Sequence, residues 1–349
     1  MSQIRNTNIE RIQSLPSPQD YLDKFPVTPN IADFISNGRE EIGRILRGED
    51  TRLLLFVGPC SLHDIEAGYE YAKRLQSLSK QVQDRLLIVM RVYFEKPRTT
   101  VGWKGMIYDP HLNGSFDITN GLDMARAFLT RIADLGILTA TEFVDPITPQ
   151  YIADLIAWGA IGARTSESQT HRQMSSGLST PVGFKNGTGG SIQLAVDAIV
   201  AAEASQAFLG VDDNGHASIV VTQGNPNCHL VLRGGSSGPN YDSASVADAI
   251  FRLEQSGVCN KVVVDCSHAN CYKDHTKQRI AFHDVVDQRK QGNMNIVGLM
   301  LESHINEGNQ KLNEAHPELL EYGVSITDPC VGWTVTLELV QHAYETLTS

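Results

Sequence analysis

Long hydrophobic runs are missing from this sequence of 349 residues, and no stretch approaches the roughly 20 apolar residues that a membrane span requires. The opening segment, MSQIRNTNIERIQSLPS, lacks the apolar core of a secretory signal. A formal net charge of −11 argues against a general basic surface for nucleic acid. We therefore expect a cytoplasmic globular protein with no membrane and no nucleic acid among its partners.

Paired cysteine motifs and a P-loop are absent as well. None of the six cysteines lies in a CxxC pair, and GxxxxGK[ST] does not occur. Most of these cysteines are interpreted as small apolar residues with reduced thiols. Cys60 differs because it ends a predicted strand, and Cys330 differs because it lies two positions after Asp328. The sequence leaves open whether Cys60 and Cys330 can oxidise together.

Eight short apolar runs are present, separated by stretches with helical periodicity. This alternation predicts parallel strands in βα units, and eight units predict a closed (β/α)₈ TIM barrel. Nearly every run ends on a residue that can carry charge or bind metal, and in this fold the carboxyl ends of the strands build the active site. The residues at these ends are Cys60, Arg91, Glu142, Arg164, Lys185, Arg233, His268 and Glu302.

Residues 1–50 are expected to form an N-terminal extension at an interface or regulatory site, with a helix over 29–47 that packs on the barrel or on a partner subunit. Residues 51–349 would form the catalytic barrel. A long loop over 94–119 is expected to be functional. An inserted hairpin is expected at about 206–222, around Asn214-Gly215. Further helices are expected over 65–78, 121–135, 149–158, 191–204, 244–256, 276–289 and 335–347.

Four candidate metal ligands, Cys60, His268, Glu302 and Asp328, follow strands that become neighbours when the barrel closes. A thiolate, an imidazole and two carboxylates suit one divalent transition metal, such as Mn, Fe, Co or Zn. The set is too soft for Mg²⁺ or Ca²⁺, which prefer oxygen ligands.

A second group of candidates is cationic. So many positive charges facing one cavity would repel each other without an anion between them, and Arg and Lys suit phosphate and carboxylate. The members are Arg91, Lys96, Arg98, Arg164, Lys185 and Arg233. Glu142 would pair with these cations or orient a water molecule. The number of cations indicates two anionic substrates, or one that carries both phosphate and carboxylate. Two glycine-rich loops, 185–190 and 233–238, would let backbone approach these anions.

Several long motifs resemble class I (type Iα) 3-deoxy-D-arabino-heptulosonate 7-phosphate (DAHP) synthase from about residue 10 to the C-terminus. They are GPCSLHD, MRVYFEKPRTTVGWKG, DPHLNGSFD, GARTSESQTHRQMSSGLS, PVGFKNGT, RGGSSGPNY, DCSHAN, ESHINEGNQ and YGVSITDPCVGW. The resemblance implies a metal-dependent transferase that condenses phosphoenolpyruvate with erythrose 4-phosphate at the entry to aromatic amino acid biosynthesis, the shikimate pathway. One departure is Gly189, where the family usually has Asp.

The resemblance also implies roles for individual residues. The metal would bind Cys60, His268, Glu302 and Asp328. Phosphoenolpyruvate would bind Arg91, Lys96, Arg164, Lys185 and Arg233, while Arg98 and Thr99 would bind the aldose phosphate. Lys96 would donate a proton or hydrogen bond to the aldehyde oxygen.

Feedback inhibition by one aromatic amino acid is implied too, at a site near the hairpin and the N-terminal segment of a homodimer or homotetramer. The expected pocket wall is Gln150, Leu178, Ser179, Phe208, Gly210 and Val220. Phenylalanine-sensing relatives tend to have Ser at the Gly210 position and tyrosine-sensing relatives Gly, so we expect tyrosine.

Two other functions compete with this interpretation. One is the sibling 3-deoxy-octulosonate-phosphate synthase, which uses arabinose 5-phosphate; the KPRTT and RGGSSGPNY loops and the hairpin argue against it. The other is a non-catalytic sensor of aromatic amino acids on an inactive barrel. Such a sensor would not need the complete metal-ligand and cation sets.

Overall fold

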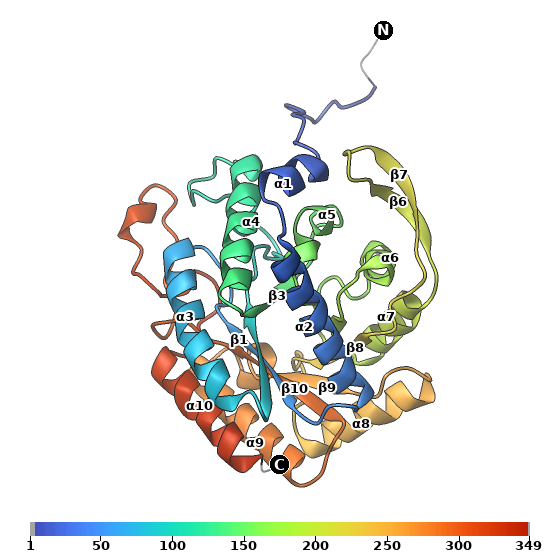
Figure 1. Cartoon of the computed structure of the whole chain (residues 1–349), viewed down its shortest axis with the longest axis vertical. Coiled ribbons are helices and arrows are strands. Elements are labelled where there is room, and N and C mark those ends of the chain that lie inside the picture. The colour runs from blue at the N-terminus through green and yellow to red at the C-terminus, as the bar shows by residue number, and fades with distance from the viewer. Residues whose placement is uncertain (1–3, 348–349) are drawn as a thin grey trace.

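The computed structural model describes residues 4–347 and contains a closed barrel of eight parallel strands (Figure 1), which confirms the predicted fold class. Around the barrel the strand order is β1-β10-β9-β8-β5-β4-β3-β2. The strands are β1 (Leu53–Gly58), β2 (Leu86–Arg91), β3 (Leu138–Glu142), β4 (Trp158–Ile161), β5 (Val182–Lys185), β8 (Cys228–Leu232), β9 (Val262–Asp265) and β10 (Ile296–Glu302).

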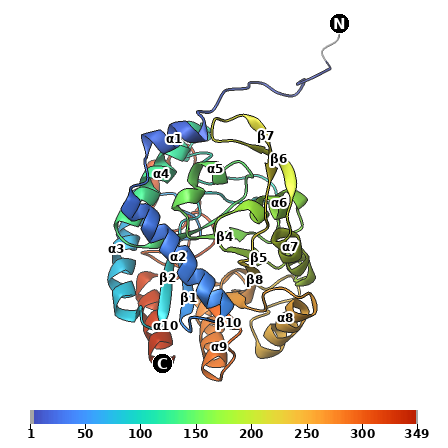
Figure 2. The same ribbon diagram turned by 45° about the vertical axis from the view of Figure 1, so that its right-hand side comes forward.

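Helices surround the strands (Figure 2). They are α3 (Ile65–Val82), α4 (Ile118–Asp134), α5 (Pro149–Ile152), α6 (Gln169–Gly177), α7 (Gln193–Glu203), α8 (Ser243–Gln255), α9 (Gln278–Lys290) and α10 (Trp333–Thr346). Short 3₁₀ turns are η1 (Ala153–Leu155), η2 (His268–Cys271), η3 (His275–Lys277) and η4 (Pro317–Leu319). Within residues 4–347, no helix is both long and apolar enough to cross a membrane.

One predicted helix, over 149–158, is wrong in its second half. Helix α5 ends at Ile152, a 3₁₀ turn follows, and Trp158 begins strand β4. The indole of Trp158 is fully buried and its Nε1 lies 3.1 Å from Nε2 of His229. Burial of this large ring inside the barrel outweighs the local helical periodicity. Helix α6 was not predicted, because its segment is mostly polar.

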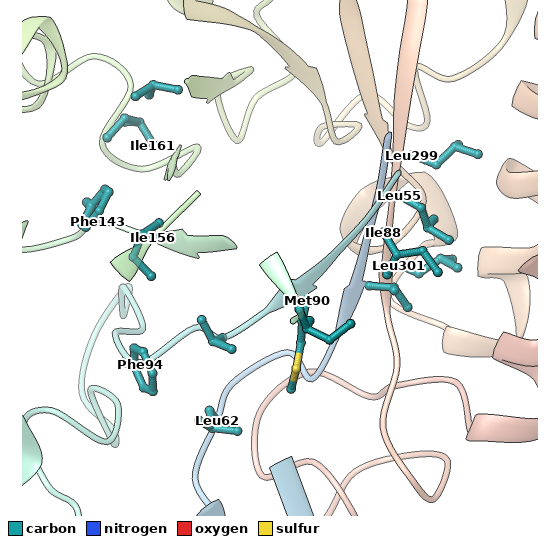
Figure 3. Close-up of a cluster of buried hydrophobic side chains, with 14 of the residues drawn as sticks. Leu55, Leu62, Ile88, Met90, Phe94, Phe143, Ile156, Ile161, Leu299 and Leu301 are labelled. Carbon is teal, nitrogen blue, oxygen red and sulfur yellow. The ribbon is translucent and has the colours of Figure 1, made fainter. Parts of the chain in front are cut away.

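Alternate residues along each strand divide the core into two parts. Leu54 and Phe56 of β1 point into the barrel, where they pack with Trp158. Leu55 and Leu299 belong to the layer between the strands and the helices, part of which Figure 3 shows. The period of two along a strand therefore decides which side chains reach the barrel interior.

The N-terminal segment contributes α1 (Pro18–Lys24) and α2 (Pro29–Arg47), and the second of these matches the predicted helix. On α2, Ile42, Ile45 and Leu46 are buried in the same cluster as the interior residues of the barrel. Gly38 permits this approach, since a Cβ atom there would lie 2.2 Å from a methyl carbon of Leu138. Helix α2 thus packs on the barrel of its own subunit.

An antiparallel hairpin, β6 (Ala207–Val211) and β7 (Ala217–Val221), forms a separate two-stranded sheet beside α6 and α7 (Figure 2). Its turn uses Gly215 with φ of 80°, a conformation that favours glycine. The backbone N–H of Gln19 on α1 donates to the Asp213 carbonyl oxygen at 2.8 Å. The hairpin tip therefore contacts the N-terminal segment.

Candidate functional site

Charged and metal-binding residues continue the inward-facing register of the strands at one end of the barrel. On β1 the inward positions Leu54 and Phe56 lead, two residues at a time, to Cys60. On β2 the inward Val89 leads to Arg91. The same alternation applies to Glu142, Lys185, Arg233, Asp265 and Glu302. The alternation of side chains along each strand thus places these groups at one site, at the carboxyl end of the barrel.

Three of the four predicted metal ligands converge. Ligand atoms of Cys60, Glu302 and Asp328 lie within 4.8 Å of one another. His268 stands beside this group, with Nε2 3.7 Å from Oε1 of Glu302. Its backbone φ of 57° is left-handed, a strained conformation for a non-glycine residue and one that recurs at functional sites. This thiol, imidazole and two carboxylates have the donor chemistry that fits a divalent transition metal.

Lys96 lies directly over the cluster. Its Nζ is 3.2 Å from Sγ and 2.9 Å from the carbonyl oxygen of Cys60. Burial raises the pKa of the Cys60 thiol to about 11, and the Glu302 carboxylate adds to this rise while Lys96 opposes it. A bound metal ion and the ammonium group would both favour the thiolate. Cys330 is also buried as a free thiol, and its pKa is raised by burial.

A cavity of about 840 Å³ opens above the cluster. Its walls include His268 and Asp328 together with most of the predicted cations. These cations are Lys96, Arg98, Arg164, Lys185 and Arg233, and Lys273 joins them on the rim. Arg91 lies deeper, fully buried, with Nη2 3.3 Å from Oε1 of Glu302. Arg91 therefore faces the metal-ligand cluster and supports the cavity from below.

The two predicted substrate regions touch at the cavity wall. Nε of Arg164 donates to Oγ1 of Thr99 at 3.0 Å. Arg98 is held by a hydrogen bond from its Nε to the Trp103 carbonyl oxygen at 2.8 Å. The long loop folds back on itself at Gly105, where a Cβ atom would lie 2.0 Å from the Phe94 carbonyl oxygen. Glycine is required at that position.

The two glycine-rich loops pack directly on each other. A Cβ atom on Gly235 would lie 2.3 Å from Cα of Gly190, and the Ser236 N–H donates to the Thr188 carbonyl oxygen at 3.0 Å. Asn186 donates from its amide to the Gly234 carbonyl oxygen at 2.9 Å. A Cβ atom on Gly189 would meet nothing within 4 Å. The usual family Asp would fit there, so Gly189 leaves the loop packing intact.

Glu142 is a carboxylate that lines the cavity beside its cations. It is buried, and its Oε1 has no hydrogen-bond partner among residues 4–347. A carboxylate oxygen in such a position can accept a hydrogen bond from a ligand or from a water molecule.

Sequence reasoning missed Tyr93, whose buried ring lies beneath three cations. The ring centroid is 3.9 Å from the guanidinium carbon of Arg91, 5.7 Å from Nζ of Lys96 and 5.8 Å from Nζ of Lys185. The π face of the ring attracts these charges and so lowers the cost of gathering them at one place. The signal was available, because Tyr93 is the next inward position after Arg91.

Glu95 is a second residue that the sequence analysis did not predict. It links the loop that contains Lys96 to the loop after β3 through hydrogen bonds. Its carboxylate accepts hydrogen bonds from the N–H groups of Val144 and Asp145 at 3.2 and 3.1 Å. The hydroxyl groups of Thr148 and Tyr108 donate to the same carboxylate at 3.1 and 3.2 Å. Glu95 therefore fixes the backbone next to Lys96.

The predicted effector residues lie in three parts of the chain: the hairpin, helix α5 and the segment that follows α6. Phe208, Gly210 and Val220 share one face of the hairpin, where Phe208 pairs with Val220. A Cβ atom on Gly210 would lie 2.7 Å from Cγ2 of Val220. The others are exposed Gln150 on α5, and Leu178 and Ser179, which follow α6.

Comparison with known proteins decides the family. The DAHP synthetase I family matches residues 24–341 of the chain. The chain belongs to this family. Its sequence is 53% identical over 331 residues to a Trp-sensitive phospho-2-dehydro-3-deoxyheptonate aldolase of Shigella flexneri, covering 95% of this chain and 94% of that protein. It is 48% identical over 344 residues to a Tyr-sensitive enzyme of Escherichia coli K12, covering 99% and 96%.

Other members of the DAHP synthetase I family agree in sequence and in fold. A Phe-sensitive enzyme of Escherichia coli K12 is 52% identical over 333 residues, covering 95% of this chain and 94% of that protein. The structure of a phospho-2-dehydro-3-deoxyheptonate aldolase from Francisella tularensis SCHU S4 superposes with a TM-score of 0.94 at 44% identity, covering 97% of this chain and 98% of that one. The resemblance in the motifs is thereby confirmed, and the chain is an enzyme of this family.

The buried carboxyl of Glu95 predicts a pH-dependent stability. Burial raises the pKa of Glu95 to about 8, although the hydrogen bonds from Val144 and Asp145 oppose the rise. A carboxyl with a pKa of about 4.3 in the unfolded chain then binds its proton more tightly in the folded state. Its contribution to the free energy of unfolding is complete below about pH 4 and is lost as pH rises towards 8.

Glu95→Gln removes this titration. Between pH 5 and pH 8 we expect the wild type to lose stability relative to the variant, by roughly 3 to 4 kcal/mol. Urea unfolding at both pH values measures the difference, with Glu345→Gln on the exposed end of α10 as the control. Parallel stability profiles for wild type and Glu95→Gln would contradict the prediction.

Proposed function

We propose that this enzyme condenses phosphoenolpyruvate with D-erythrose 4-phosphate to give DAHP and phosphate. The observation that carries the proposal is the position of Lys96, within 3.2 Å of the Cys60 thiol and at the wall of the cation-lined cavity. A metal-ligand cluster and a binding surface for anionic substrates thus meet at one ammonium group. Family membership supports the same reaction.

The cations hold the substrates in this proposal. Arg164, Lys185 and Arg233 bind the phosphate and carboxylate groups of phosphoenolpyruvate, and Arg91 supports that site from beneath. Arg98 and Thr99 bind the phosphate of the aldose, next to Arg164. The hydrogen bond between Arg164 and Thr99 supports this division, because it puts the two phosphate sites side by side. Such positioning reduces the entropic cost of bringing two substrates together.

The chemical step needs a Lewis acid, a proton donor and a proton acceptor, which we assign to the metal ion, Lys96 and Glu142. A divalent metal held by Cys60, His268, Glu302 and Asp328 supplies a Lewis acid for the aldehyde. Lys96 donates a proton to the aldehyde oxygen while C3 of phosphoenolpyruvate forms the new bond to the aldehyde carbon. Glu142 orients the water that adds to the cationic C2 and accepts a proton from it. The C2–O bond to phosphate then breaks, and phosphate leaves with the electron pair. The hydroxyl at C2 gives its proton to the departing phosphate and becomes the ketone of DAHP.

Metal removal tests the reaction. After chelator treatment we expect turnover of phosphoenolpyruvate and erythrose 4-phosphate to fall more than about a thousandfold, since a Lewis acid contributes several kcal/mol. Added Mn²⁺ should restore turnover, which is followed by release of inorganic phosphate. Cys60→Ala should not be restored, whereas Cys259→Ala, altered at a half-buried cysteine beside the Leu46 carbonyl, should behave like the wild type. Unchanged activity after chelation, or turnover of arabinose 5-phosphate instead, would overturn the proposal.

Tyrosine is the effector that we propose, at the hairpin face containing Gly210. The relatives above carry names for all three aromatic amino acids, so the proposal depends on the side-chain space at this position. A Cβ atom on Gly210 would press on Val220, and a larger side chain would fill space that a phenolic hydroxyl needs.

Gly210→Ser is therefore expected to weaken tyrosine inhibition by about tenfold or more, in line with the cost of a lost fit in a binding pocket. Inhibition curves for Tyr, Phe and Trp measure the effect. Leu209→Ser is the control, because Leu209 lies on the opposite face of the hairpin and is 87% exposed. Inhibition of the wild type by Phe or Trp in place of Tyr would refute the tyrosine assignment.

A further inference from the structure

Asp265 is a buried carboxylate between the two halves of the site, and neither the metal-ligand set nor the cation set includes it. It is the last residue of β9 and is fully buried. Its Oδ2 lies 2.9 Å from Nδ1 of His268 and 3.1 Å from Nζ of Lys185. Its Oδ1 accepts hydrogen bonds from the N–H and the hydroxyl of Ser267. One carboxylate therefore contacts a proposed metal ligand and a proposed substrate-binding cation.

The contact with His268 determines which ring nitrogen is available. Nδ1 of His268 lies 2.9 Å from Oδ2 of Asp265 and 2.8 Å from Oγ of Ser267. The Ser267 hydroxyl donates its own proton to Asp265 and the ionised carboxylate can only accept, so Nδ1 carries the proton towards this pair. Nε2 is then left with its lone pair free, and this is the nitrogen 3.7 Å from Oε1 of Glu302. A carboxylate behind a metal-binding imidazole sets its tautomer and orientation, and losing that partner typically costs 10–100-fold in metal affinity.

The contact with Lys185 determines where its ammonium group lies. Lys185 ends β5 and is 3% exposed, yet it forms part of the cavity wall. A lysine side chain has several rotatable bonds, so a fixed partner is needed to hold its charge at one place. Oδ2 of Asp265 is such a partner on the side away from the cavity. A buried ion pair adds little to stability by itself because of its desolvation cost, which favours a functional reason for this one.

We propose that Asp265 is a positioning residue for both halves of the active site. It orients His268 for the metal ion and Lys185 for the anionic group of phosphoenolpyruvate. The inference rests on the proposed function and extends it, since it makes the metal site and the anion site depend on one side chain. Ser267, through its two hydrogen bonds to Oδ1, holds that side chain in place.

The test measures binding to each half separately, in full-length Asp265→Asn, which keeps the shape and removes the charge. Co²⁺ binding to the chelated protein is followed through the visible absorption of the ion. Binding of phosphoenolpyruvate to the metal-free protein is measured by equilibrium dialysis. We expect the Kd for Co²⁺ to rise 10–100-fold and the Kd for phosphoenolpyruvate to rise about tenfold.

Three variants serve as references. His268→Ala should weaken only Co²⁺ binding, and Lys185→Ala should weaken only phosphoenolpyruvate binding, so a loss of both in Asp265→Asn identifies the shared role. Asp287→Asn, on the exposed side of α9, should match the wild type in both assays. Ser267→Ala loosens Asp265 without removing it, and the Kd for phosphoenolpyruvate should rise by a smaller factor. This Kd is the decisive readout of the variant, because the Ser267 hydroxyl also lies 2.8 Å from Nδ1 of His268 and its loss affects Co²⁺ binding directly. This variant keeps the test decisive if Asp265→Asn does not fold.

Unchanged binding of either ligand in a folded Asp265→Asn protein would overturn the shared role, as would unchanged binding of phosphoenolpyruvate in Ser267→Ala. A wild type that binds neither Co²⁺ nor phosphoenolpyruvate would instead contradict the proposed function. The two failures are thus separated by the wild-type measurement.

Discussion

Parallel pairing between β1 and β10 is the contact on which the whole site depends, because it closes the barrel. This pairing puts Gly58 opposite Glu302 and so brings the first strand's Cys60 beside the last strand's carboxylate. The chain after β10 then returns, and the Val331 N–H donates to the Glu302 carbonyl oxygen at 2.9 Å. This returning segment carries Asp328, whose carboxylate lies in the same cluster as Cys60 and Glu302. Residues more than 240 positions apart in sequence therefore share one cluster of candidate metal ligands.

Charge balance explains how so many ionisable groups can be buried at one end of a barrel. Three of the proposed anions have a cation close by: Cys60 has Lys96, Glu302 has Arg91, and Asp265 has Lys185. Burial alone would raise the pKa of Asp265, but His268 and Lys185 hold it well below its usual range. The remaining cations face the cavity, where substrate anions would complete the balance.

The barrel could be predicted from sequence because its strands are buried on both sides and appear as apolar runs. That charged strand ends gather at one cavity could be predicted because a charged residue directly after such a run is unusual. Asp265 was not predicted, because His268 in the same segment already offers a metal ligand. Strict alternation from the inward Val263 identifies Asp265 as the residue that faces the interior, whereas His268 arrives through a left-handed turn. The same alternation identifies Tyr93, two residues after Arg91, as an inward-facing residue.

Other features could not have been read from a single sequence. The N-terminal half of segment 149–158 is helical, but Trp158 becomes a strand residue because its ring fills the barrel interior. That outcome depends on tertiary packing and not on local periodicity. The role of Glu95 depends on backbone N–H groups that lie about 50 residues away, at Val144 and Asp145. Only the folded chain brings such groups together.

The central claim is that one metal ion is held at the closure of the barrel, beside the cation-lined cavity. Anomalous X-ray diffraction from crystals grown with Mn²⁺ and phosphoenolpyruvate tests it most directly. We predict a single strong anomalous peak within bonding distance of Cys60 Sγ, His268 Nε2 and the carboxylates of Glu302 and Asp328, with phosphoenolpyruvate between Lys96 and Lys185. A peak at any other place, or phosphoenolpyruvate outside the cavity, would contradict this account.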